Sequence, residues 1–193
     1  MSTHAVTGAV LAGGASRRMG RDKALIDVGG RTLIDRALDV MADFDRVVVL
    51  GGSAQVAQIC SRRGVEVLAD VHPGSGPLMA ILTAVEQVGD VVAMAVDMAG
   101  VEAAMVDAVR AGGDARGVDI AVATSLGELQ PALARWNASV YPAAMAAVDD
   151  GVRSLFGVVG RNEVSVVQVE VGAGVGINLN TPADVAIFDD AGQ

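Results

Sequence analysis

The sequence predicts an α/β fold of three layers, in which a doubly wound, mostly parallel, Rossmann-like sheet carries helices on both faces. Three observations favour this fold. Short valine-rich runs alternate with stretches in which apolar residues recur at helical spacing. Hydrophobic residues make up 52% of the chain and aromatic residues only 3%, so the core is aliphatic. The apolar runs reach about six to eight residues, which is typical of buried parallel strands.

The first half of the chain alternates regularly between strands and helices. Four valine-rich runs predict strands at residues 6–12, 46–51, 65–69 and 91–96. Apolar residues at helical spacing predict helices over 33–41 and 78–88, and Ser53 is expected to cap a third helix that ends at 62–64. Because parallel strands need crossover connections, this order implies helices on both faces of one sheet.

The second half is less regular. Strands are expected at residues 118–123, 129–136 and 164–171, and helices at 140–148 and 152–159. Thr181 and Pro182 are typical of a helix start, with the threonine as cap and the proline in the first turn. The 193 residues are expected to form a single domain, 1–193, because this length suits one domain.

Residues 11–23 carry the most specific chemical signal. Gly13 and Gly14 end the first strand, and a cationic loop follows them. Its four basic side chains are Arg17, Arg18, Arg21 and Lys23. Glycines let a backbone pass close to a ligand, and arginine and lysine neutralise phosphate oxygens. The loop matches neither G-x-x-x-x-G-K-[ST], since Ala24 replaces the hydroxyl, nor G-x-G-x-x-G, since its glycines are adjacent. It therefore predicts phosphate binding of another kind.

Two carboxylates are expected beside this loop. Asp70 and Asp97 each follow a predicted strand, and the carboxyl ends of parallel strands meet at one edge, where ligands bind. Asp97 suits magnesium, because a hard divalent cation prefers carboxylate oxygen. Lys23 suits phosphate oxygens as a mobile charge, and Arg18 suits them through a bidentate contact.

The charge balance and the apolar pattern exclude some classes of function. The net charge is -9, whereas a general nucleic-acid binder needs a broad basic face. No run approaches the roughly 20 apolar residues of a membrane-spanning helix, and no charged-then-apolar leader opens the chain. We therefore expect a cytoplasmic protein that binds neither nucleic acid nor membrane. Cys60, the single cysteine, excludes an internal disulfide and is expected to be a buried, inert thiol.

The loop resembles the signature of the molybdopterin nucleotidyltransferases, most closely their guanylyltransferase branch. The matching residues are Leu11-Ala12-Gly13-Gly14-x-Ser16-x-Arg18-Met19-Gly20-x-Asp22-Lys23-Ala24. The later matches, in order, are Asp70-x-x-Pro73-Gly74-x-Gly76-Pro77-Leu78, Asp97 and Asn178-Leu179-Asn180-Thr181-Pro182-Ala183-Asp184. The resemblance extends over nearly the whole chain, from residue 7 to residue 188.

The resemblance implies a nucleotidyltransferase that uses magnesium to transfer GMP from GTP to the molybdopterin-bound molybdenum cofactor, with release of pyrophosphate. The catalytic residues it implies are Arg18, Lys23 and Asp97. The nucleotide-binding residues it implies are Leu11, Ala12 and Gly13 through their backbone, together with Lys23, Asp70 and Asp97, the last as the metal ligand.

The asparagine motif is implied to lie on the pterin side of the cleft. Asn178 and Asn180 are expected to alternate along a strand and therefore to point the same way. Molybdopterin is the implied small-molecule substrate. Transient contact with molybdenum-insertion proteins or apo-molybdoenzymes is implied as well.

Several assignments have a purely structural alternative. Lys23 is alternatively a solvated lysine, and Arg18 a partner of Asp22. Asp97 alternatively caps the next helix, and Asp70 organises the turn that follows it. The asparagine motif is alternatively a hydrogen-bonded turn before the last helix.

Two departures from the family pattern bear on the function. After Asp97 the family usually has one residue, then a proline and a bulky apolar residue. This chain has Ala99 and Gly100 there, which should leave the metal-binding turn less fixed. Leu50 stands where the family has asparagine, so either Gly51 and Gly52 contact the base or sugar through their backbone, or guanine selectivity is weakened.

Two other functions stay open. One is a CTP-dependent molybdopterin cytidylyltransferase, although Gly13-Gly14 resembles the guanylyl form more closely. The other is a catalytically impaired nucleotide-binding paralogue, which the residues at positions 50, 99 and 100 favour.

Overall fold

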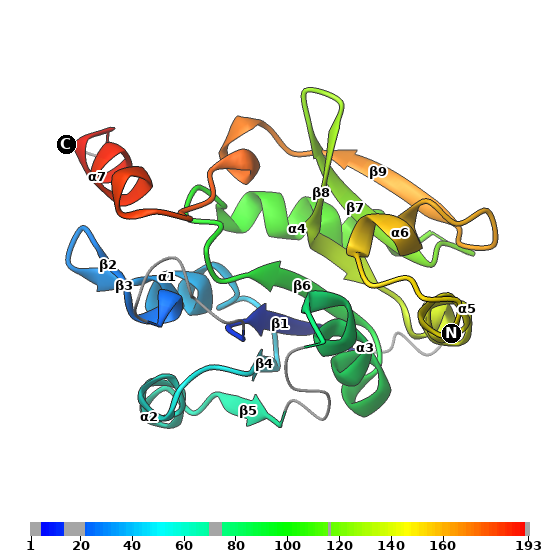
Figure 1. Cartoon of the computed structure of the whole chain (residues 1–193), viewed down its shortest axis with the longest axis horizontal. Helices are drawn as coiled ribbons and strands as arrows, with labels where there is room; N and C mark the ends of the chain where they lie inside the picture. The colour runs from blue at the N-terminus through cyan, green and yellow to red at the C-terminus, as the bar shows by residue number, and fades with distance from the viewer. Residues whose placement is uncertain (1–4, 14–21, 70–74, 116, 192–193) are drawn as a thin grey trace.

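The computed structural model describes residues 5–13, 22–69, 75–115 and 117–191, and its centre is a seven-stranded sheet (Figure 1). The strand order is β5-β4-β1-β6-β8-β7-β9. The strands are β1 (Thr7–Leu11), β4 (Val47–Leu50), β5 (Glu66–Leu68), β6 (Val91–Ala95), β7 (Ile120–Ser125), β8 (Glu128–Trp136) and β9 (Val166–Glu170). The seven strands expected between residues 6 and 171 are all confirmed, with small shifts at the ends.

The sheet is mostly parallel, as predicted. β1 pairs in parallel with β4 on one side and with β6 on the other, and β7 pairs in parallel with β9. β8 is antiparallel to both of its neighbours, β6 and β7. The β7–β8 connection is only Leu126 and Gly127, both with positive φ. A two-residue turn joins only antiparallel strands, so this hairpin sets the direction of β8.

Helices cover both faces of the sheet (Figure 1). The helices of one face are α1 (Leu33–Val40), α2 (Ala54–Arg62) and α4 (Ala103–Gly112), and those of the other are α3 (Pro77–Val88), α5 (Tyr141–Asp149) and α6 (Leu155–Val159). Successive side chains of a strand point to opposite faces. Val10 accordingly joins the core under α1, α2 and α4, while Ala9 and Leu11 join the core under α3, α5 and α6. The three-layer prediction is confirmed.

The predicted helix signals are borne out locally. The Ser53 hydroxyl accepts a hydrogen bond from the Val56 amide at 3.4 Å and starts α2. The Thr181 hydroxyl accepts from the Asp184 amide at 3.2 Å at the start of α7 (Pro182–Ala191). Cys60 is fully buried, and burial raises the pKa of its thiol, as expected of an inert cysteine. Within the described ranges, every helix is too short or too polar to cross a lipid bilayer.

Several elements were not expected from the sequence. They are α4, the short antiparallel ribbon of β2 (Asp27–Val28) and β3 (Arg31–Thr32), and the 3-10 helices η1 (Lys23–Leu25), η2 (Ala138–Val140) and η3 (Ala173–Gly176). The short ones are set by turns and caps rather than by an apolar period, so periodicity does not detect them.

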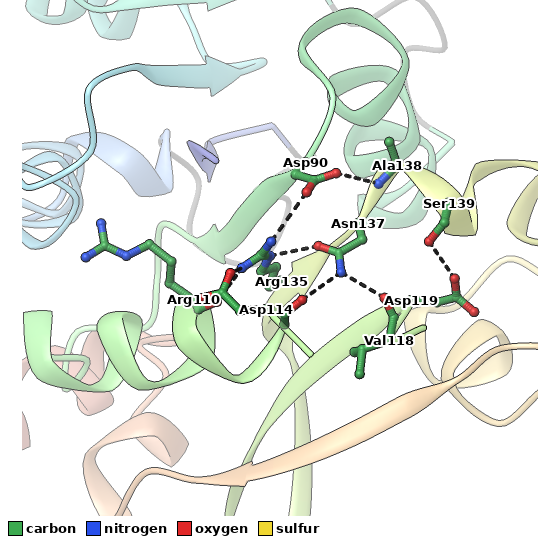
Figure 2. A network of polar contacts seen from close by, with 10 residues as sticks. Asp90, Arg110, Asp114, Val118, Asp119, Arg135, Asn137, Ala138 and Ser139 are labelled. Atoms are coloured by element: carbon green, nitrogen blue, oxygen red, sulfur yellow. Dashed lines mark hydrogen bonds and ion pairs between the residues drawn. The ribbon is translucent and has the colours of Figure 1, made fainter. Parts of the chain in front are cut away.

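A buried polar network ties the sheet to α4 (Figure 2). Arg135, at the end of β8, is only 5% exposed. Its guanidinium contacts the carboxylates of Asp114 and Asp90, the latter at 3.4 Å, and donates to the Arg110 carbonyl at 2.6 Å. Arg135 Nε donates to Asn137 Oδ1 at 2.7 Å. A buried guanidinium requires such partners, and here they come from three separate segments.

We predict that Arg135→Met lowers the free energy of unfolding by about 3 kcal/mol, because it removes a buried cation whose contacts join three segments of the chain. Urea unfolding measures this change. Arg161→Met is the matched control, because Arg161 pairs with Asp150 near the surface, where an ion pair contributes about 0–1 kcal/mol. Equal losses in the two variants would contradict the prediction.

Candidate active site

Lys23, the only lysine of the chain, lies against Asp97 and Asn180. Its ammonium forms an ion pair with Asp97 Oδ2 and donates to Asn180 Oδ1 at 2.8 Å. The side chains of Lys23 and Asp97 are each 20% exposed, so the pair is half-buried but open to solvent. Asp97 lies 74 positions after Lys23 in the sequence, and Asn180 lies 157 positions after it. All three are predicted from the sequence as site residues.

The sheet explains why they meet. β1 and β6 are parallel neighbours, and the Val96 amide continues their ladder by donating to the Leu11 carbonyl at 3.1 Å. The glycine loop and Asp97 therefore leave the sheet at the same edge. The Leu179 amide donates to the Asp97 carbonyl at 3.0 Å, which brings the asparagine motif to that edge too. The predicted convergence of Lys23 and Asp97 is confirmed.

Two of the structural alternatives are wrong. Lys23 is not a solvated lysine, because it is held by a carboxylate and an amide oxygen. Asp97 does not cap the next helix, since the N-cap position of α4 is Glu102. Arg18 and Asp70 lie outside the described residues, as do Gly14, Arg17 and Arg21.

The expectation of a strand through Asn178 and Asn180 is wrong. Both lie in irregular backbone between η3 and α7. The Asn178 amide donates to the Gly176 carbonyl at 3.3 Å, whereas Asn180 turns to Lys23. The Asp184 carboxylate accepts from the backbone amides of Asn180 and Thr181, at 2.7 and 2.8 Å. The motif is therefore a hydrogen-bonded turn before the last helix, which was the structural alternative given for it. This turn directs Asn180 toward Lys23.

Leu50 and the glycines after it form the neighbouring wall. Leu50 is 1% exposed, so its side chain belongs to the core, while its carbonyl accepts from the amides of Ala12 and Gly13, both at 3.0 Å. Gly51 has φ +74°, and a Cβ built on it would lie 2.7 Å from Gly13 Cα. Only glycine permits this approach, so the backbone at 51–52 lies directly beside the first glycine of the loop.

Asp22 joins the loop to the next helix. One of its carboxylate oxygens accepts from the Ala24 amide at 3.1 Å, and the other accepts from the Ser53 amide at 3.2 Å. The carboxylate thus starts η1, which carries Lys23, and anchors it to the start of α2. Sequence reasoning gave Asp22 only as an alternative partner of Arg18 and missed this role.

The turn after Asp97 is held without the family's proline. The Ala99 amide donates to the Asp97 carbonyl at 2.9 Å, and the Val101 amide to the Met98 carbonyl at 3.2 Å. Gly100 packs against η3, where an added Cβ would lie 2.5 Å from the Gly174 carbonyl oxygen. Close backbone packing therefore replaces the missing ring as the restraint on this turn.

In the part of the chain that the structure describes, no three His, Cys, Asp or Glu side chains gather into a metal-binding cluster. The oxygens of Asp97 and Asn180 do converge on one cation, the Lys23 ammonium. Carboxylate and amide oxygens are ligands of hard divalent ions such as Mg²⁺, which keeps several waters and needs few protein ligands. The donor set therefore fits such an ion. A parallel sheet with these groups at its carboxyl edge is the arrangement of a nucleotide-binding α/β protein.

Comparison with known proteins agrees with this class. A family model, the MobA-like NTP transferase domain, matches residues 8–164. The molybdenum cofactor guanylyltransferase of Mesorhizobium japonicum is 31% identical over 194 residues, covering 94% of this chain and 93% of that one. The probable molybdenum cofactor guanylyltransferase of Opitutus terrae is 40% identical, but over 52% of each chain. The molybdopterin-guanine dinucleotide biosynthesis protein A of Archaeoglobus fulgidus has 25% identity and a TM-score of 0.80, covering 96% of this chain and 98% of that one.

The chain belongs to the MobA-like NTP transferase family. This confirms the resemblance found in the loop at residues 11–24 and the expectation of a nucleotidyltransferase. The matched region holds β1, the Lys23 loop and the Asp97 turn, whereas the asparagine motif lies beyond it.

We predict that Gly51→Ala weakens nucleoside triphosphate binding at least about tenfold, because the new methyl group displaces Gly13. Gly64→Ala is the matched control: Gly64 has φ +67° and nothing within 4 Å of an added Cβ. Both variants should lose about 1 kcal/mol of stability from backbone strain. The melting temperature of each variant, measured at increasing triphosphate concentration, separates the loss of binding from the loss of stability. Equal triphosphate binding by both variants would contradict the prediction.

A second prediction concerns Asp184, whose pKa lies below its ordinary value of 3.8 because the amides of Asn180 and Thr181 donate to its carboxylate. A lowered folded-state pKa means that the stabilisation is complete above pH 3.8 and lost as the pH falls through the folded-state value. The stability difference between wild type and Asp184→Asn should therefore shrink below pH 3.8. Urea unfolding at several pH values measures it, with Asp149→Asn on α5 as control. A difference independent of pH would refute the assignment.

Proposed function

We propose that this protein transfers GMP from GTP to the molybdopterin-bound molybdenum cofactor, which yields the guanine dinucleotide form of the cofactor and pyrophosphate. The observation that carries the proposal is the contact of Lys23, from the cationic loop, with Asp97 and Asn180. Family membership and the names of relatives matched over most of their length support the reaction class. We infer that residues 1–193 act as one domain, since β1 and β9 belong to one sheet.

Lys23 and Asp97 would bind opposite charges of a magnesium–triphosphate complex, Lys23 its phosphates and Asp97 its metal ion. The Lys23 ammonium would neutralise triphosphate oxygens, and the Asp97 carboxylate beside it would hold Mg²⁺. A magnesium ion held by Asp97 would supply positive charge that offsets the negative charge developing on the leaving pyrophosphate. Arg18 and Asp70, assigned from the sequence, would add a second phosphate contact and a nucleotide contact. Two anions must meet in this reaction, so positioning and positive charge supply most of the catalysis.

The backbone directly after β1 supports guanine as the base. The amides of Ala12 and Gly13 both donate to the Leu50 carbonyl, so this segment has carbonyl oxygens rather than amides to offer a ligand. A carbonyl accepts hydrogen bonds, and guanine presents an amino donor beside its ring N–H. Gly51 lies beside Gly13, so the backbone of Gly51 and Gly52 is close to the same place. This favours backbone contact with the base or sugar, rather than weakened guanine selectivity, as the consequence of having Leu50 instead of asparagine.

Asn178 and Asn180 would face the acceptor. Asn180 lies at the site and has an amide nitrogen left to donate, while its Oδ1 accepts from Lys23. Asn178 lies two residues away and is half-buried. A pterin offers both donors and acceptors, and asparagine matches such an edge. The molybdopterin cofactor is thus the proposed small-molecule partner, with apo-molybdoenzymes or molybdenum-insertion proteins as transient ones.

The reaction is tested by incubating the purified chain with Mg²⁺, GTP and molybdopterin-bound cofactor. We expect pyrophosphate release that falls by at least about 100-fold in Lys23→Ala and in Asp97→Asn. GTP should raise the melting temperature more than CTP does, because a ligand of the folded state stabilises it. Release no faster than in Lys23→Ala would overturn the proposal. A preference for CTP would assign the cytidylyl reaction instead, and tight GTP binding without turnover would assign an impaired paralogue.

The ion pair makes a separate prediction about metal binding without nucleotide. Lys23 neutralises Asp97 in the unliganded site, so Lys23→Met should bind Mn²⁺ about tenfold more tightly than wild type, while Lys23→Arg should not. Water-proton relaxation or calorimetry measures the affinity. Equal affinity in the wild type and the two variants would show that Lys23 does not compete for the Asp97 carboxylate.

A further inference from the structure

A cavity of about 200 Å³ lies behind the Asp97 turn, between α1 and the segment that follows β6. Its floor consists of four buried apolar side chains, Met94, Val96, Met98 and Val101. Its opposite wall is the face of α1 that carries Leu33, Ala37 and Val40. Among the described residues that line it, none is Lys23, Asp97 or Asn180. The cavity is therefore distinct from the candidate active site, although Val96 and Met98 flank Asp97.

The polar side of the cavity is formed by two arginines and one carboxylate, Arg31, Arg36 and Asp39. Arg36, on α1, has an Nε that is buried and makes no hydrogen bond. Its guanidinium lies over the Phe188 ring of α7, with Cζ 5.5 Å from the ring centroid. The nearby carboxylate, Asp39, is already held by Arg31 and Arg63. Within the described ranges Arg36 thus has an aromatic neighbour but no carboxylate to accept from its buried N–H.

Both features favour a ligand. The cavity opens to solvent and has the liquid volume of about six or seven waters. Transfer of an apolar group from water onto its apolar floor is favourable. A buried donor without an acceptor is destabilising, because it has lost its hydrogen bond to water. A single ligand that packs against the apolar floor and accepts from Arg36 would satisfy both.

We propose that this cavity binds a small organic anion with one carboxylate and an apolar ring or chain, roughly seven to ten non-hydrogen atoms in all. The carboxylate accepts from the Arg36 guanidinium, and the apolar part packs against Met94 and Met98. A carboxylate is favoured over a phosphate because burying a second negative charge among apolar side chains adds a large desolvation cost. Ala99 contributes only a methyl group to the lining and so leaves this space open.

The test uses 4-fluorobenzoate as the probe and the full chain as the protein, without nucleotide or metal. We expect saturable binding by fluorine NMR, with affinity in the millimolar range or tighter. Uncharged 4-fluorobenzyl alcohol should bind at least about tenfold more weakly, because it cannot pair with a guanidinium. Since no nucleotide is present, the result does not depend on the proposed reaction.

Three variants locate the bound probe. Arg36→Met removes the guanidinium, and Ala99→Leu fills the cavity; each should weaken 4-fluorobenzoate binding at least about tenfold. Ala99→Val, which fills less of the space, should give an intermediate loss and serves if the leucine variant does not fold. Arg62→Met, an exposed arginine on α2, is the matched control and should leave binding unchanged.

Lys23→Ala tests the active site as the competing location and should also leave binding unchanged. Absence of saturable binding by wild type, or binding that survives both Arg36→Met and the Ala99 variants, would overturn the proposal. Loss of binding in Lys23→Ala alone would place the probe in the phosphate site and would overturn it as well.

Discussion

The adjacency of β1 and β6 is the constraint on which the whole site depends. These strands are neighbours in the sheet, so the segments leaving their carboxyl ends begin side by side. One segment leads to Lys23 and the other begins with Asp97, and the ion pair between them closes a loop of 74 residues. The site therefore requires the central sheet to be complete, because neither segment alone would place its charge. This explains why the chemistry lies in loops while the positioning comes from buried valines.

The C-terminal part of the chain reaches this site by a longer route. β9 is the last strand at the far edge of the sheet, yet the residues after it return to β6. Backbone contacts help to fix the return: Gly100 and Gly174 approach too closely for side chains, and the Leu179 amide donates to the Asp97 carbonyl. The buried side chains of Val175 and Leu179 anchor the same segment in the core. Asn180 is then held by the Asp184 carboxylate on its other side. The position of one amide oxygen thus results from contacts spread over the second half of the protein.

The parallel strands could be predicted because runs such as residues 47–50 and 91–96 are apolar without interruption, and strands buried on both faces require that pattern. The convergence of Lys23 and Asp97 followed from the rule that carboxyl ends share an edge. The position of Asn180 did not follow, because the strand expected there is replaced by a turn that the Asp184 carboxylate imposes. Alternation of polar residues cannot reveal such a turn. The resemblance to a known family supplied what the pattern could not.

The cavity behind α1 shows a different limit. The apolar residues that line it look like ordinary core in the sequence, and only three-dimensional packing shows that they do not fill the space between them. Arg36 likewise reads as one more polar residue on an amphipathic helix. That its Nε is buried without an acceptor depends on the distance to other elements, which no local pattern contains.

At the proposed active site, substrate binding would exchange the partners of two charges rather than create new burial costs. In the unliganded state Lys23 and Asp97 neutralise each other. If a metal–triphosphate complex binds there as proposed, the carboxylate would pair with the metal and the ammonium with a phosphate. Neither protein charge would then be left unpaired, which would avoid the large cost of isolating one of them. In a chain of net charge -9 with a single lysine, such an exchange would let an anionic substrate bind without a broad basic surface.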